Sequence, residues 1–191
     1  MNEIVKPGAG LLYMKVGTHA NEPLDSIIER KQAEIDAAGF ALWGYGGNTC
    51  HPTTMVQPFA RDFETRGQTI HLVMHPMVSN HFAVTDRAEE MSTDSQEWEP
   101  IPGAINVLGS RFALAIAELR SVDFSLPLSS TRVAVGNSRG KPGDEYIQRQ
   151  VDKAVLEVVD EPLDDAGSER ETEKIGLIAE LVEPYAVFVR N

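Results

Sequence analysis

Residues 40–60 read FALWGYGGNTCHPTTMVQPFA and set the pattern on which the fold is built. The apolar run 40–45 predicts a β-strand, and it ends at Gly46-Gly47, where the missing Cβ allows the backbone to turn sharply. Residues 53–57 predict a turn. Pro58 suits the first turn of a short helix that extends to residue 66, with Gly67 as its stop. Strand and helix therefore alternate in this part of the chain.

The preceding segment predicts an amphipathic helix between residues 24 and 38, after a strand at 11–16. Asn21 is the expected N-cap, Pro23 lies in the first turn, and Gly39 ends the helix. The apolar residues recur at helical spacing, and the exposed face is expected to carry the charged and polar ones. The apolar set is Leu24, Ile27, Ile28, Ile35 and Ala38; the polar set is Glu29, Arg30, Lys31, Gln32 and Glu34.

The rest of the chain predicts mainly strands. They are expected at residues 69–75, 104–108, 112–119, 132–135 and 153–159, with a closing ribbon at 175–182 and 185–189 and short helical pieces at 85–91 and 144–150. We therefore expect an α+β fold with a curved, mostly antiparallel sheet or small barrel and two or three helices in the N-terminal half. The expectation is a single domain over 1–191, with a loose leader at 1–9 and an acidic surface loop at 160–172.

Composition limits the possible partners. The 191 residues carry a net charge of −12, from 29 acidic and 17 basic residues. This balance does not fit binding to long duplex nucleic acid, which requires a basic surface. One cysteine excludes an internal disulfide and a multi-cysteine zinc site, and we expect neither metal nor cofactor. With neither a signal peptide nor a membrane-spanning run in view, we expect a cytoplasmic protein.

The first candidate site is a ligand pocket around residues 43–57. Trp43 and Tyr45 lie two apart on a strand and share one face, so they can stack a flat ring or hold a cation. The alternative is that both simply pack on the first helix. The other candidates nearby are Gly46, Gly47, Asn48, Thr49 and Gln57, which offer close backbone approach or hydrogen bonds.

The second candidate is thiol catalysis. Cys50 and His51 are adjacent, and His71, His75 or His81 could approach Cys50 in the fold, so Cys50, His51 and His75 are weak catalytic candidates. A buried structural cysteine is the alternative. His71 and His75 lie about 13 Å apart along one strand, too far to share one ion. A site of Cys50, His51 and His81 stays open.

The third candidate is the glycine-rich loop 136–143. Its glycine spacing and Pro142 do not match a phosphate-binding loop of the Walker type. Ser138, Arg139 and Lys141 could still form an anion-binding nest, or the segment could be an ordinary hairpin loop. If the 46–51 and 136–141 loops meet, they would form one composite pocket.

Four segments together resemble the PUA-like barrels, among them the EVE, ASCH and YTH relatives. They are GFALWGYGG (39–47), GQTIHLVMH (67–75), SRFALAIAELR (110–120) and VAVG (133–136). Gly67-Gln68 stands where those families often carry Gly-Asp, which is a departure from their pattern. The resemblance implies a non-enzymatic pocket for a base, with Trp43 and Tyr45 stacking on it and Asn48, Thr49 and Gln57 reading its edges.

Three functions follow as hypotheses. The first is a binding module for a small nucleobase- or nucleotide-like ligand. The second is an enzyme that acts on a small substrate through Cys50 or the histidines. The third is an acidic inhibitor or adaptor that engages a basic protein partner through the carboxylates of residues 86–99 and 157–173.

Overall fold

The structure is a computed structural model that describes residues 4–79, 83, 85–147, 151–160 and 172–191. The helices are α1 (Leu24–Ala38), α2 (Gln57–Thr65) and α3 (Gly143–Tyr146), with a π-helical turn at Pro52–Val56 and a 3₁₀ turn at Leu128–Ser130. The strands are β1 (Gly10–Val16), β2 (Ala41–Tyr45), β3 (His71–Pro76), β4 (Glu90–Ser92), β5 (Glu99–Pro100), β6 (Phe112–Pro127), β7 (Thr131–Val133), β8 (Lys153–Val158) and β9 (Thr172–Arg190).

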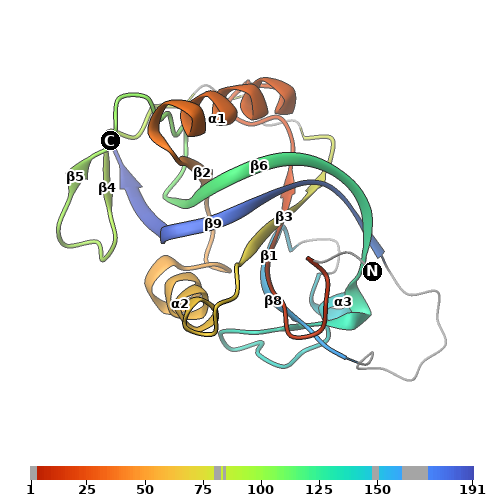
Figure 1. Ribbon diagram of the computed structural model, residues 1–191. Coiled ribbons are helices and arrows are strands. Elements are labelled where there is room, and N and C mark those ends of the chain that lie inside the picture. The colour runs from red at the N-terminus through yellow and green to blue at the C-terminus, as the bar shows by residue number, and fades with distance from the viewer. Residues whose placement is uncertain (1–3, 80–82, 84, 148–150, 161–171) are drawn as a thin grey trace.

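The strands form one sheet in the order β2-β6-β9-β3-β1-β8-β7, with β4 added beside β9 and β5 beside β4. Among the strands of the described residues, only the β1–β3 pair is parallel, so the expected mostly antiparallel α+β fold is confirmed. Within the described residues nothing pairs β2 with β7, and the sheet is open rather than a closed barrel. Figure 1 shows how strongly β6 and β9 bend, with α1 at the top and α2 at lower left.

The longest strand, β9, connects several parts of the sheet. It pairs with β3, β4 and β6, and the β6–β9 ladder contains several register shifts, which bend strands and increase their twist. Glu183–Pro184 is a cis peptide and Tyr185 has a φ of 65°. The strand nevertheless continues through this point, so the two segments expected at 175–182 and 185–189 are one element.

Several local expectations are wrong. Pro23, not Asn21, is the N-cap of α1, and Asn21 adopts a φ of 61° in the preceding turn. Residues 53–57 do not form a simple turn, because the π-helical turn runs directly into α2. Residues 85–91 are not helical: β4 begins there and pairs with β9.

Two further segments differ from expectation because tertiary contacts decide them. Residues 104–108 form no strand, yet Ile105 and Val107 are buried against the outer side of β2, β6 and β9. The described part of the leader is not loose: Ile4 is buried and Ala9 pairs with Val158. Of the expected acidic loop, residues 161–171 lie outside the described part of the chain.

The buried apolar side chains of the described residues form three clusters, one of which lies under the candidate site. This first cluster fills the concave side of the sheet between β1, β2, β3, β6 and β9, and it includes Trp43, Tyr45 and Cys50. The second cluster packs around β7 and β8, and the third lies under residues 88–107. Helix α1 closes one end of the first cluster through Leu24, Ile28 and Ile35.

Candidate functional site

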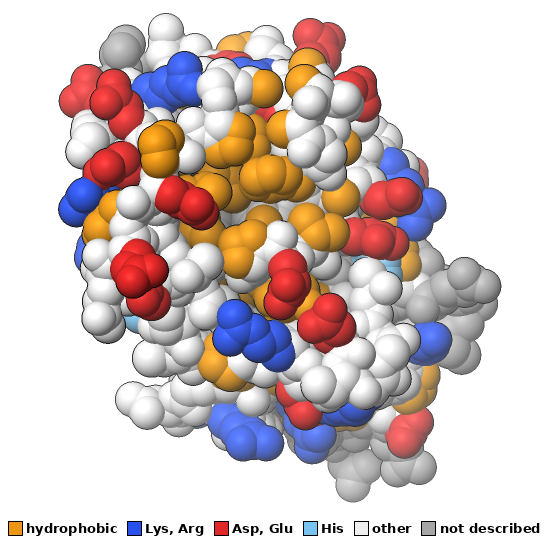
Figure 2. Space-filling view, turned by 60° about the vertical axis from the view of Figure 1, so that its left-hand side comes forward, with side chains coloured by type: hydrophobic (Ala, Val, Ile, Leu, Met, Phe, Trp, Pro, Cys, Tyr) orange, Lys and Arg blue, Asp and Glu red, His pale blue; other side chains and the backbone are white. Residues whose placement is uncertain are grey.

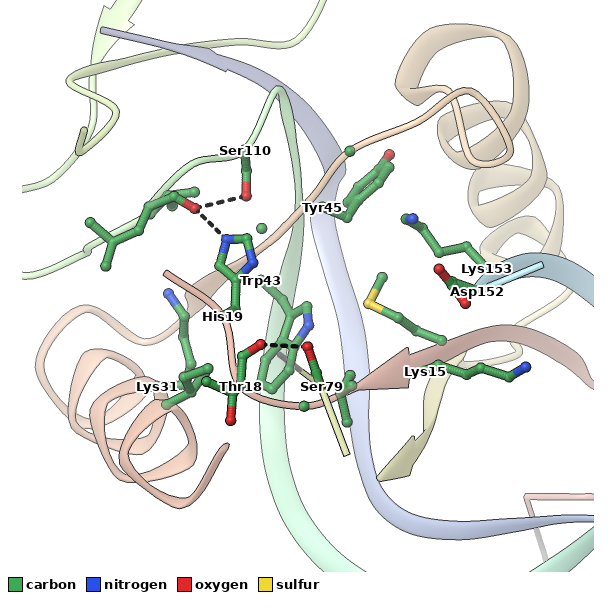
Figure 3. Close-up of a pocket in the computed structure, with 18 of the residues that line it drawn as sticks. Lys15, Thr18, His19, Lys31, Trp43, Tyr45, Ser79, Ser110, Asp152 and Lys153 are labelled. Atoms are coloured by element: carbon green, nitrogen blue, oxygen red, sulfur yellow. Dashed lines mark hydrogen bonds between the residues drawn. The ribbon is translucent and has the colours of Figure 1, made fainter. Parts of the chain in front are cut away.

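A pocket of about 280 Å³ lies where several strands end at the rim of the curved sheet (Figure 3). The end of β1 and the turn after it form one side, and the end of β2 forms another. Helix α1, the segment after β3, the segment before β6 and the start of β8 complete it. The lining includes the side chains of Lys15, Lys31, Trp43, Ser79, Asn106 and Lys153.

The topology explains why these segments converge. Strands β1 and β3 are parallel and therefore end at the same edge of the sheet, and β8 is antiparallel and starts there opposite Met14. The turns after β1 and β3 are in close contact: Ser79 donates a hydrogen bond to the Thr18 carbonyl over 2.8 Å. A Cβ on Gly17 would stand 2.6 Å from the Met77 carbonyl oxygen, so glycine is required for this approach.

The two aromatic residues of β2 belong mainly to the core. Trp43 is 5% exposed and Tyr45 is 4% exposed, and the Tyr45 hydroxyl donates a hydrogen bond to the Cys50 carbonyl. The alternative, that both rings pack on the first helix, agrees with this burial, because Leu24, Ile28 and Ile35 of α1 pack against the same core cluster. Both still line the pocket, where they form a fixed wall with little ring surface available for stacking.

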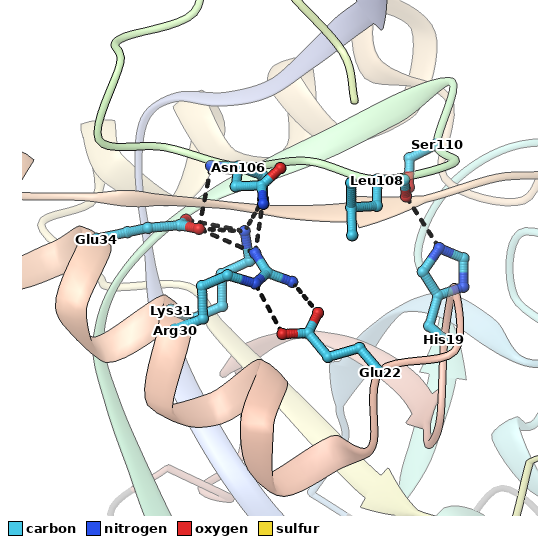
Figure 4. A network of polar contacts seen from close by, with 8 residues as sticks. All are labelled: His19, Glu22, Arg30, Lys31, Glu34, Asn106, Leu108 and Ser110. Atoms are coloured by element: carbon cyan, nitrogen blue, oxygen red, sulfur yellow. Dashed lines mark hydrogen bonds and ion pairs between the residues drawn. The ribbon is translucent and has the colours of Figure 1, made fainter. Parts of the chain in front are cut away.

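A buried ion cluster fixes the opposite wall (Figure 4). Lys31 donates to both oxygens of Glu34, over 2.8 and 3.1 Å, and to the Asn106 carbonyl over 2.8 Å. Arg30 reaches the same carbonyl over 2.7 Å and also pairs with Glu22. The Asn106 N–H donates back to Glu34 over 3.1 Å. Helix α1 is thus clamped to the segment before β6.

This cluster corrects the sequence analysis, which placed Lys31 and Glu34 on the exposed face of the helix. They are 3% and 2% exposed. Both follow Ile27 at the i+4 and i+7 positions, which is the spacing of the buried helix face and is the signal that could have revealed them. Burial lowers the pKa of Lys31 to about 8, and the Glu34 carboxylate opposes that shift.

Three other polar groups of the pocket lack an acidic or hydrogen-bond partner in the described residues. Lys15 and Lys153 have no acidic partner within 4 Å in the described residues, and both flank Asp152 (Figure 3). The Asn106 side-chain oxygen is buried and has no hydrogen-bond partner there. Nothing in the local sequence marks Lys15, Lys153 or Asn106 as candidates for the site.

Of the predicted ligand-binding residues, Trp43, Tyr45 and Gly46 line the pocket. Gly47 adjoins it near Lys153, whereas Asn48 and Thr49 are not part of the lining. Gln57 is buried elsewhere, and its amide nitrogen donates to the Thr93 and Ala186 carbonyls over 2.8 Å each. Both hydrogen bonds of the Gln57 amide nitrogen are therefore made within the protein.

The 136–141 loop does not join the pocket; it touches Met55 through Gly136 instead. The backbone N–H groups of Arg139 and Lys141 donate to carbonyls of the same loop, and that of Gly140 donates to Val133. These bonds occupy the donors that an anion-binding nest around Ser138, Arg139 and Lys141 would need. The geometry is that of a hairpin loop.

The histidine candidates for catalysis contact groups other than Cys50. His51 packs edge-on against Phe112 and Phe188, at centroid distances of 5.5 and 5.4 Å. His75 Nδ1 lies 3.0 Å from a Glu173 carboxylate oxygen and 2.8 Å from the Lys174 carbonyl. His71 and His75 lie on β3 beside different glutamates, and the described residues contain no group suited to a metal ion. His81 lies outside those residues.

The Cys50 thiol should react slowly in the native protein. It is 2% exposed, and burial raises its pKa to about 12 although Lys153 opposes the shift. Because the thiolate is the reactive form, iodoacetamide near pH 7 should label Cys50 far more slowly than a free thiol, and denaturant should restore the normal rate. Labelling of the native protein faster than a free thiol would contradict this expectation and favour thiol catalysis.

The molecular surface carries the negative charge at several places. Figure 2 shows a hollow lined by hydrophobic side chains and bordered by acidic ones. Some carboxylates of residues 86–99 are already engaged: Glu90 pairs with Arg190, and Asp94 accepts hydrogen bonds from the backbone of Gln96 and Glu97. None of the described helices is long and apolar enough to cross a membrane.

Comparison of this chain with protein-family models, with curated proteins and with solved structures finds no match.

Proposed function

We propose that this protein is a binding module for a small nucleotide-like ligand, held in the pocket between α1, β2 and the start of β8. The observation that supports it best is the combination of an apolar wall with two lysines, Lys15 and Lys153, that have no acidic partner in the described residues. In a chain with a net charge of −12, unpaired cations at a pocket favour an anionic ligand.

The two parts of the pocket suit the two parts of such a ligand. Trp43, Ile27 and Val107 offer apolar contacts for a ring. Lys15 and Lys153 can contact a phosphate. A volume of about 280 Å³ is at the small end for ligand sites, which favours a mononucleotide or nucleoside over a dinucleotide. The resemblance to PUA-like barrels agrees with a base-like ligand.

Removal of one pocket lysine should weaken nucleotide binding. Lys153→Ala or Lys15→Ala should raise the Kd for a nucleoside monophosphate about tenfold or more, because each loses a charge-assisted hydrogen bond. The same variants should change the Kd for the uncharged nucleoside much less. Isothermal titration calorimetry with monophosphates and nucleosides measures both.

Lys141→Ala is the matched control, because Lys141 lies outside the pocket. It should bind as the unmodified protein does. An equal loss of affinity in the control would indicate nonspecific charge attraction. If the protein bound no base, nucleoside or nucleoside monophosphate, that result would contradict the proposed function.

The fluorescence of Trp43 gives an independent readout. The second tryptophan, Trp98, stacks with Arg190 at 4.0 Å and lies outside the pocket. In a Trp98→Phe background, ligand entry should change the emission of Trp43 with the same midpoint as the calorimetric titration. An unchanged spectrum at saturation would place the ligand elsewhere.

An acidic adaptor for a basic protein partner is the second candidate. The apolar hollow with acidic side chains around it supports this reading (Figure 2). Binding of such a partner should weaken steeply with added salt and should persist in Lys153→Ala. Catalysis by Cys50 has less support, because the thiol is buried outside the pocket lining.

A further inference from the structure

A second, separate cleft has a volume of about 500 Å³. It lies among the N-terminal segment, the turn between α2 and β3, and the neighbouring strands β3, β9 and β6. Its charged and titratable side chains are Lys6, His71, Arg120 and Glu180, and Gln68 and Thr69 complete the polar lining. None of these residues lines the first pocket.

Sheet pairing explains how three of these side chains meet. His71 on β3 is opposite Glu180 on β9, and Glu180 is in turn opposite Ala117 on β6. The ladder then shifts register between Ala117 and Arg120, where Glu118 adopts a φ of 52°. Such bulges redirect side chains. Here the bulge precedes Arg120, which borders the same cleft as His71.

The cleft has two positively charged side chains without a carboxylate partner in the described part of the chain. Neither Lys6 nor Arg120 has a carboxylate within 4 Å in the described residues, and Glu180 is the one acidic side chain of the lining. Glu180 lies 3.9 Å from His71 Nε2. Burial lowers the pKa of His71, Glu180 raises it and Arg120 lowers it, with burial the largest effect.

From this geometry we propose that the cleft between the α2–β3 turn and β6 binds the phosphate group of a small phosphomonoester. Arg120 presents a planar set of donors that matches phosphate oxygens, and Lys6 adds a second positive charge. Glu180 and the His71 ring stand beside them and can hydrogen-bond a hydroxyl or amine on the organic part. A volume of about 500 Å³ has room for that part as well as the phosphate.

The first test follows the His71 ring by NMR while inorganic phosphate or glycerol 3-phosphate is added. Its signals, assigned with His71→Gln, should move saturably, while those of His51 and His75 move little. Tighter binding of glycerol 3-phosphate than of inorganic phosphate would support an ester as the ligand, and equal binding would contradict the ester and leave free phosphate. Signals of His71 that do not move with either probe would overturn the proposal.

Two variants should act in opposite directions. Arg120→Ala should weaken phosphate binding about tenfold. Glu180→Gln should strengthen it several-fold, because it removes the one negative charge of the cleft. Both residues lie on the surface, so the fold should tolerate these changes. Unchanged affinity in both variants would also overturn the proposal.

Lys153→Ala separates this cleft from the first pocket. It should leave the response of His71 to phosphate intact, and Arg120→Ala should leave the nucleotide-induced change in Trp43 emission intact. The binding proposals for the two sites can therefore be tested, and contradicted, independently of each other.

Discussion

Replacement of Glu34 by glutamine should lower the free energy of unfolding by about 3–5 kcal/mol, because it removes the carboxylate from a buried ion cluster. Glutamine has almost the same shape, so the loss is electrostatic. Lys31, at 3% exposure, would keep a buried charge without its counter-ion. Chemical denaturation measures the change, which for a chain of this length corresponds to roughly 10 °C in Tm.

Two controls separate this effect from general sensitivity to mutation. The double variant Lys31→Met/Glu34→Leu removes both charges and should recover most of the lost stability, since apolar pairs often replace buried ion pairs at little cost. Asp123→Asn breaks the exposed Lys174–Asp123 pair and should change stability by less than about 1 kcal/mol. A small loss in Glu34→Gln would mean that water reaches the cluster.

The same cluster predicts a pH dependence of stability. The pKa of Lys31 is about 8 in the folded protein, compared with an ordinary value of 10.5. Between these values the unfolded chain binds more protons, so the contribution of Lys31 to stability should increase as the pH rises from 8 towards 10.5. Denaturation curves across this range should show the increase, and Lys31→Met should abolish it.

Trp43→Ala should destabilise the protein by about 3–5 kcal/mol, because the ring is 5% exposed and its removal leaves a cavity in the first core cluster. Loss of ligand binding in this variant would therefore not by itself assign the ring to the site. Trp43→Phe should cost less, because it keeps an aromatic ring in the core. Denaturant titration of both variants measures their free energies of unfolding. If Trp43→Ala were as stable as the unmodified protein, the Trp43 ring would not be needed for core packing.

Local sequence was sufficient for the elements whose pattern is periodic. The apolar residues of α1, its stop at Gly39, the strand that ends at Gly46 and the strand from Lys153 were all predicted close to their observed bounds. It failed where tertiary packing sets the structure. Residues 104–108 look like a strand, but their pairing is limited to an isolated bridge between Leu108 and Arg87, and Ile105 and Val107 pack against the sheet instead.

The candidate site shows the same difference between what local sequence predicts and what tertiary packing sets. Trp43, Tyr45 and Gly46 were found because aromatic and glycine residues at a strand end are recognisable in the sequence. The loop at 136–141 is a separate candidate in the sequence, which leaves open whether it meets the 46–51 loop, and the fold places it beside Met55 and outside the pocket lining. Cys50 attracted attention as the single thiol, and its 2% exposure makes it a core residue.

By itself the sequence determined the α+β class, the acidic charge and the position of the aromatic strand, since composition and periodicity are properties of neighbouring residues. The tertiary structure alone decided which cations gather. Lys15, Lys31 and Lys153 come from β1, α1 and β8, and they meet because the parallel β1–β3 pair and the antiparallel β8 share one edge of the sheet. Strand pairing between distant segments sets that meeting, and local sequence does not encode it.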